Sequence, residues 1–136
     1  MDSSERLLLG GRGKAAAVAR YRSVLQVDES NVDALNNLAV ALVDRDPREA
    51  LSLAQQAASL ASENPAVRDT LGWAYYAKGL YPSAVPHLQY AVEKEPTAIR
   101  QFHLAMCYLK IGDRERGSSF LNLAVAKDPS LLAKAR

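Results

Sequence analysis

Cys107, His87 and His103 are the residues of this 136-residue chain whose types could support nucleophilic catalysis. A thiol becomes a good nucleophile when a neighbouring base or cation favours its thiolate form. Cys107 is expected to be a small buried residue beside Tyr108 without an activating charge, and His87 belongs to a different predicted helix, at an exposed position. We therefore predict no catalytic residues and no enzyme activity.

A second set of residues, near the start of the chain, could bind a phosphate group. Gly11, Gly13 and Ala16, with Asp28 downstream, match the G-x-G-x-x-A pattern of dinucleotide-binding loops. No second strand follows this pattern. A phosphate-binding loop is excluded because Leu8 stands where that motif needs its first glycine. We interpret the glycine cluster as a turn and expect no cofactor.

Cysteine content and charge exclude further classes of site. A single cysteine permits no intramolecular disulfide and no cysteine-based metal site, so we predict no bound metal. The net charge is +2, and basic and acidic residues are interspersed except near the start of the chain. The basic residues that predominate there are Arg6, Arg12, Lys14, Arg20 and Arg22. Because no aromatic platforms lie between these charges, we read a solvated helix face and predict no nucleic-acid binding.

The distribution of apolar residues predicts no membrane-spanning segment. The longest apolar run, Leu38 to Val43, is far too short to cross a bilayer, and the first residues lack the pattern of a signal peptide. We predict a soluble segment with no membrane insertion. The compartment stays unknown, with the cytoplasm slightly favoured.

The elements that position these residues are predicted to be helices. Apolar residues recur at helical spacing, as in Leu35, Leu38 and Leu42, while prolines mark helix starts and Gly79 marks a break. Pro86 should remove one backbone hydrogen bond and bend its helix. We predict a helical stub before the glycine cluster, and helices at Lys14–Val27, Val32–Val43, Pro47–Leu60, Pro65–Lys78, Pro82–Lys94, Ala98–Ile111, Arg114–Ala126 and Leu131–Arg136.

A fixed step of 33 residues relates the predicted helices to one another. Leu38, Leu71 and Leu104 are equivalent positions. So are Ala39, Gly72 and Ala105, and so are Leu42, Tyr75 and Tyr108. The second helices repeat small residues, as at Ala50, Ala84 and Gly117, and Pro96 and Pro129 close two units. This pattern resembles the tetratricopeptide repeat, a helix-turn-helix unit with L-G-x2-Y in its first helix and a closing proline.

The resemblance covers nearly the whole chain and departs from the family pattern at a few positions. The family often has Trp near the start of each unit, where this chain has Leu35, Arg68 and Gln101, and Glu29 replaces a closing proline. We count about three and a half repeats in a single domain, 1–136. The predicted units are a partial repeat at 1–29, mainly its second helix, then repeats at 31–63, 64–96 and 97–129, and the start of a capping helix at 130–136.

The resemblance implies an all-α fold, a right-handed α-α superhelix or solenoid of antiparallel helix pairs. It also suggests a fragment of a longer bacterial array. In this family the first helix of each unit lines a concave groove. The residues predicted to face that groove are Asn36, Val40, Val43, Asp69, Trp73, Tyr76, Phe102, His103, Met106 and Leu109. The alternative is that Trp73, Tyr76 and Phe102 belong to the core between units.

The predicted function is a non-enzymatic scaffold that binds a partner peptide or helix of another protein in this apolar groove. Asn36 and Asp69 would orient the partner. Two alternatives stay open. The end repeats could stack to form a homo-oligomer, or the array could be the recognition arm of a larger enzyme whose chemistry lies elsewhere.

Overall fold

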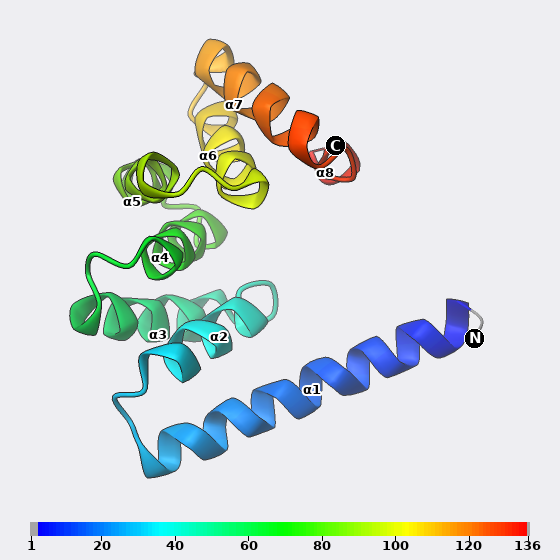
Figure 1. The fold of residues 1–136 in the computed structure, drawn as a ribbon, viewed down its shortest axis with the longest axis vertical. Coiled ribbons are helices and arrows are strands. Elements are labelled where there is room, and N and C mark those ends of the chain that lie inside the picture. Colours follow the sequence, from blue (N-terminus) through cyan, green and yellow to red (C-terminus); the bar gives the residue numbers. More distant parts are fainter. Residues whose placement is uncertain (1–2, 136) are drawn as a thin grey trace.

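The computed structural model describes residues 3–135, with side chains from Gly13 onward, and the regular elements of this part are all helices, joined by short turns (Figure 1). The prediction of an all-α fold is confirmed. The helices are α1 (Ser3–Val27), α2 (Val32–Leu42), α3 (Pro47–Leu60), α4 (Pro65–Ala77), α5 (Tyr81–Lys94), α6 (Ala98–Lys110), α7 (Arg114–Lys127) and α8 (Leu131–Lys134).

Local capping interactions begin most of these helices where the sequence predicts. Asn31, Asp46 and Asn64 each accept a hydrogen bond from a backbone N–H of the first turn that follows them, as do Thr97 and Asp113. Such caps satisfy donors that have no partner within the helix. The bounds of α2 to α8 agree with the predicted ranges to within two residues, apart from Arg136, which lies outside the described residues.

Two glycines end the first helices of their pairs. Gly79 follows α4 with a φ of 77°, and Gly112 follows α6 with a φ of 89°. Residues with a side chain rarely adopt this left-handed conformation, so glycine at these points stops the helix and turns the chain back. Pro86 lies inside α5, which nevertheless continues to Lys94.

The prediction that the early glycine cluster ends a helix is wrong. The backbone is one continuous helix, α1, from Ser3 to Val27, and Gly11 and Gly13 lie inside it. A glycine costs a helix only about 1 kcal/mol relative to alanine, and good helix formers such as Ala15 and Ala16 follow the cluster. The G-x-G-x-x-A pattern is therefore helical, neither a turn nor a phosphate-binding loop. The side chains of Arg6 and Arg12 lie outside the described part.

The helices stack into a curved array (Figure 1), in which α2–α3, α4–α5 and α6–α7 form antiparallel pairs. The leading half of α1 extends away from this body, and its later half packs on α2 through Val18, Tyr21 and Leu25. The turn between α2 and α3 and the short helix α8 lie on the same side, facing the inside of the curve.

Small residues allow the paired helices to approach closely. Ala50, Ala54 and Ala57 on α3 are completely buried. A Cβ atom built on Gly72 of α4 would lie 2.6 Å from Cγ and Cδ2 of Leu88 on α5, which is too close for carbon atoms. The buried core of the described residues lies between neighbouring helices in three clusters, and Tyr75 packs against the first two. Contacts between neighbouring units are expected for a solenoid.

Candidate functional site

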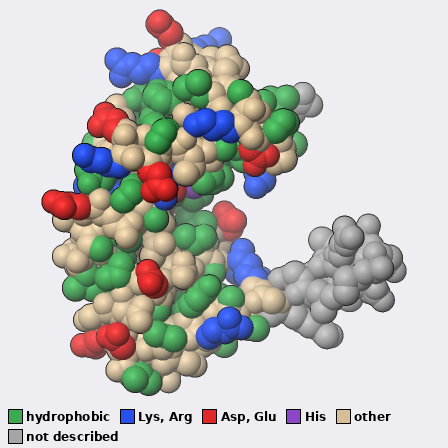
Figure 2. All heavy atoms as spheres, viewed as in Figure 1, with side chains coloured by type: hydrophobic (Ala, Val, Ile, Leu, Met, Phe, Trp, Pro, Cys, Tyr) green, Lys and Arg blue, Asp and Glu red, His purple; other side chains and the backbone are tan. Residues whose placement is uncertain are grey.

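The inner side of the array holds a cavity of about 530 Å³, which we call the concave cavity. Figure 2 shows a hollow in the surface on this side, between the upper and the lower helices. The volume lies in the range of about 300–1,000 Å³ that is usual for ligand-binding pockets. The lining residues are Val40, Val43, Asp44, Asp69, Thr70, Trp73, Tyr76, Ile99, Phe102, His103, Met106 and Lys134.

Alternate helices supply this lining. Val40 and Val43 come from α2 and its C-terminal end, Trp73 from α4, and Met106 from α6. These are the first helices of the three pairs, and side chains at i, i+3 and i+4 on each share one face. Lys134 comes from α8, the next helix in the stack.

Aromatic rings form the centre of the wall. The rings of Trp73 and Tyr76 are stacked, with centroids 4.3 Å apart and an interplanar angle of 9°. The imidazole of His103 stacks on Trp73 at 4.0 Å and 16°, and Phe102 is tilted against Trp73 at 6.4 Å. Trp73 and Tyr76 remain half-buried, so part of each ring can contact a bound molecule. Burial raises the pKa of the Tyr76 phenol, with smaller contributions from Tyr81 and Cys107.

A buried carboxylate and an imidazole join two walls of the concave cavity. Nδ1 of His103 on α6 lies 3.0 Å from both carboxylate oxygens of Asp69 on α4, and both residues are at least nine-tenths buried. An ionised carboxylate only accepts hydrogen bonds, so Nδ1 is the protonated nitrogen that donates. The Asp69 carboxylate thus already has a hydrogen-bond partner within the protein. This contact holds the imidazole flat against Trp73.

Exposed apolar side chains flank the aromatic centre. Val40 is 54% exposed and Ile99 is 43% exposed, so both aliphatic side chains are open to solvent at the cavity. Among the polar groups of the lining, the hydroxyl of Thr70 donates to the carbonyl of Ala66 in its own helix. The concave cavity therefore offers mainly apolar and aromatic surface to a ligand.

The predicted groove and the concave cavity overlap in most residues. Eight of the ten predicted residues line it, whereas Asn36 and Leu109 do not. Leu109 instead approaches Gly117 of α7, where an added Cβ would lie 2.6 Å from its Cδ2 atom. Asn36 has its side-chain oxygen buried without a hydrogen-bond partner. Phe102 was predicted to face the groove or, alternatively, to belong to the core between units. It does both, since it lines the concave cavity and packs against Ala124 and Leu131 in the core.

Four lining residues were missed by the sequence analysis: Asp44, Thr70, Ile99 and Lys134. Asp44 and Thr70 each follow a predicted residue directly, and Ile99 lies one turn before His103. Helical spacing could have found Ile99. No comparable signal pointed to Lys134, because its place depends on how α8 packs.

The remaining residues with reactive side chains have structural surroundings. Cys107 is completely buried, its thiol donates to the carbonyl of Tyr81, and burial raises its pKa to about 11. His87 was predicted to be exposed, but it is half-buried, stacks on Tyr75 and accepts a hydrogen bond from Arg68. Within the described residues, no three His, Cys, Asp or Glu side chains gather as a metal site would need. No helix there is long and apolar enough to span a bilayer.

Antiparallel helix pairs stacked into a curved array, with a cavity on the inner side, define the class of helical-repeat solenoids. The model of the tetratricopeptide repeat family matches residues 42–98 and 70–131, and the chain belongs to this family. The expected α-α superhelix is thereby confirmed. Proteins of this family are in general non-enzymatic scaffolds for interactions with proteins or peptides.

Known proteins and structures show the same architecture. The TPR repeat-containing protein PA4667 of the bacterium Pseudomonas aeruginosa is 35% identical over 77 residues, which are 55% of this chain and 13% of that protein. The chain thus spans a small part of this relative. The crystal structure of MamA has a TM-score of 0.74 and 21% identity, covering 99% of this chain and 79% of the other.

YrrB is described as a TPR protein with an unusual peptide-binding site. Its crystal structure has a TM-score of 0.69 to this chain and 25% identity, and the match covers 96% of this chain and 68% of YrrB.

Proposed function

We propose that this chain is a protein-interaction module that binds a short apolar segment of a partner protein in the concave cavity. The observation that carries the proposal is the combination, in one cavity, of the half-buried ring of Trp73 with the exposed aliphatic side chains of Val40 and Ile99. Soluble proteins leave such contiguous apolar surface where a partner covers it. The peptide-binding site named for YrrB supports this reading.

Burial of apolar partner side chains would provide the affinity. One fully buried aliphatic or aromatic side chain contributes about 1.5–3 kcal/mol. The freedom of motion that is lost when the partner associates and becomes ordered has a free-energy cost, which offsets several such contributions. Two or three anchors against Val40, Trp73 and Ile99 therefore suit a weak, reversible complex. The Asp69–His103 pair holds the wall in place, because its carboxylate is already occupied and the imidazole is stacked.

Trp73 is the only tryptophan of the chain and reports on the concave cavity directly. Synthetic amphipathic peptides, with apolar cores of three to six residues, would be titrated while Trp73 emission and backbone NMR shifts are recorded. We expect a change of emission, and shifts confined to residues that line the cavity. If no peptide perturbs Trp73 or these shifts, the proposed function is wrong.

Matched variants distinguish binding in the concave cavity from nonspecific binding to other apolar surfaces. Val40→Asp and Ile99→Asp place a charge on its apolar rim and should weaken peptide binding at least tenfold. Leu123→Asp makes the same change on α7 at a residue that is 49% exposed and outside the cavity. This control should bind as the parent does. Equal loss in all three variants would contradict binding in the concave cavity.

Self-association is the second candidate. Val27, at the end of α1, is 92% exposed, and Leu132 on α8 is 45% exposed, so each end of the array presents an aliphatic side chain that a second copy could cover. Sedimentation velocity over a wide concentration range tests it. A strict monomer at the highest concentration would exclude this candidate.

A further inference from the structure

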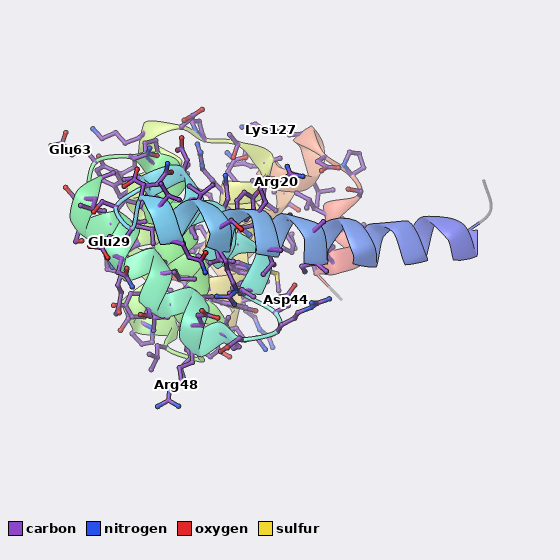
Figure 3. All side chains as sticks on the ribbon, turned by 90° about the horizontal axis from the view of Figure 1, so that it is seen from below. Arg20, Glu29, Asp44, Arg48, Glu63 and Lys127 are labelled. Atoms are coloured by element: carbon purple, nitrogen blue, oxygen red, sulfur yellow. The ribbon has the colours of Figure 1, made fainter. Side chains whose placement is uncertain are left out.

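Two charged residues at the rim of the concave cavity have opposite signs and separate origins. Asp44 follows the C-terminal end of α2, and Lys134 lies on α8, well over half the chain later. In Figure 3, Asp44 lies on the side of the body toward which α1 extends, which is the inner side of the curve seen in Figure 1. The two charges therefore belong to different walls of one cavity.

Both rim charges are available to a ligand. Neither Asp44 nor Lys134 takes part in any of the ion pairs found among the described residues. The other carboxylate of the lining, Asp69, is occupied by His103. Arg45 is adjacent in sequence to Asp44, but it does not line the concave cavity.

Backbone dipoles strengthen this polarity. The C-terminal end of a helix carries a partial negative charge of roughly half an elementary charge, and the N-terminal end a corresponding positive one. Asp44 lies next to the C-terminal end of α2, which adds to its negative potential. Ile99, in the first turn of α6, places the positive end of that helix at the lining. A cation is thus favoured at Asp44, and an anion beside Lys134 and the start of α6.

We propose that the segment bound in the concave cavity is dipolar, with a Lys or Arg side chain at Asp44, an apolar middle on Val40 and Trp73, and a carboxylate at Lys134. The inference rests on the proposed function and names its partner class. The carboxylate belongs to an Asp or Glu side chain or to a C-terminus, and both sources present the same chemistry to Lys134. Charge sets the direction in which the segment lies, while apolar contacts supply most of the affinity.

The test uses blocked synthetic peptides that share one Leu- and Ala-rich core. One peptide carries Lys at its first and Glu at its last position, and companions carry two Lys, two Glu or two Gln residues. A further peptide begins with Lys and ends in a free carboxylate in place of Glu, which distinguishes the two sources. Calorimetry and Trp73 emission give the dissociation constants. We expect one of the dipolar peptides to bind tightest. Each charge that is opposite to its rim residue should lower the dissociation constant roughly two- to fivefold at low salt, and less at high salt.

Charge reversal on the protein makes the prediction specific. Lys134→Glu should make the two-Lys peptide the best ligand, and Asp44→Lys should do the same for the two-Glu peptide. Arg48→Glu is the matched control, because Arg48 is exposed and points away from the body in Figure 3. This control should keep the parent order of affinities.

The outcomes separate the two proposals. Equal affinities for all peptides, or an order that Lys134→Glu and Asp44→Lys leave unchanged, would overturn the dipolar partner while binding in the concave cavity stands. Absence of binding by every peptide, the uncharged one included, would overturn both.

Discussion

Nδ1 of His103 lies 3.0 Å from each carboxylate oxygen of Asp69, and this contact joins α6 to α4 across two neighbouring helix pairs. Both side chains are almost fully removed from water. The same imidazole stacks on Trp73, so one residue links the inter-pair contact to the wall of the concave cavity.

Removal of either partner of this contact should destabilise the fold. Asp69→Leu or His103→Phe leaves the other polar group buried without its partner, which costs about 1–3 kcal/mol. The double variant removes both groups and should cost less than the sum of the two single changes. Urea unfolding of the four proteins gives the coupling energy. Strictly additive costs would show that the two side chains do not interact in solution.

Gly72 should tolerate no side chain. Gly72→Ala forces a Cβ atom against the completely buried Leu88, and such overpacking costs about 1–3 kcal/mol. In a Leu88→Ala background the same change should cost less, because the obstructing atoms are gone. Thermal or urea unfolding measures both effects.

Gly13 provides the matched control for this substitution. It lies inside α1, and no atom outside its own helix backbone and chain neighbours lies within 4 Å of an added Cβ. Gly13→Ala should stabilise the protein by up to about 1 kcal/mol through helix propensity. A loss of stability in this variant would argue against the continuous helix.

Acidification should weaken the fold through His87. Burial in the first place, and the neighbouring Arg68 guanidinium, lower the pKa of this imidazole in the folded protein. As the pH falls below about 6.5, the unfolded chain binds a proton at His87 before the folded protein does. The free energy of unfolding should therefore decline from that pH down to the lower folded pKa.

His87→Gln keeps an acceptor for Arg68 and removes the titrating group. The difference in unfolding free energy between this variant and the parent should shift in favour of the variant as the pH falls. A difference that is constant between pH 7.5 and 5 would contradict the assignment.

Cys107 should resist thiol reagents in the folded state. Its side chain is completely buried and its pKa is about 11, so very little thiolate exists at pH 8 and the reagent cannot reach it. Labelling should be fast in denaturant and slower by orders of magnitude in buffer. Rapid labelling of the native protein would show that α6 opens locally.

The sequence alone determined the helices from α2 onward and their register. Asn and Asp caps, first-turn prolines and the glycines at Gly79 and Gly112 act within a few residues, so their effect can be read without the fold. The step of 33 residues then relates the pairs to one another, because equivalent packing positions must recur in each unit. Seven residues of the concave cavity belong to a series that the same step relates, and His103 lies next to one of them. The resemblance to the family assigned this series to the groove.

The tertiary structure decided which side chains line the concave cavity, and the structure showed that α1 is continuous. Local sequence signals leave both points open. The glycines of α1 only lower helix propensity, so the sequence could not tell a continuous helix from an interrupted one. Leu109 and Tyr76 occupy equivalent positions, yet only Tyr76 lines the concave cavity, since Leu109 fills the space left by Gly117. Lys134 reaches the cavity because α8 packs beside α6 and α7. The curvature of the stack and the neighbours of each helix decide which side chains remain open to a partner.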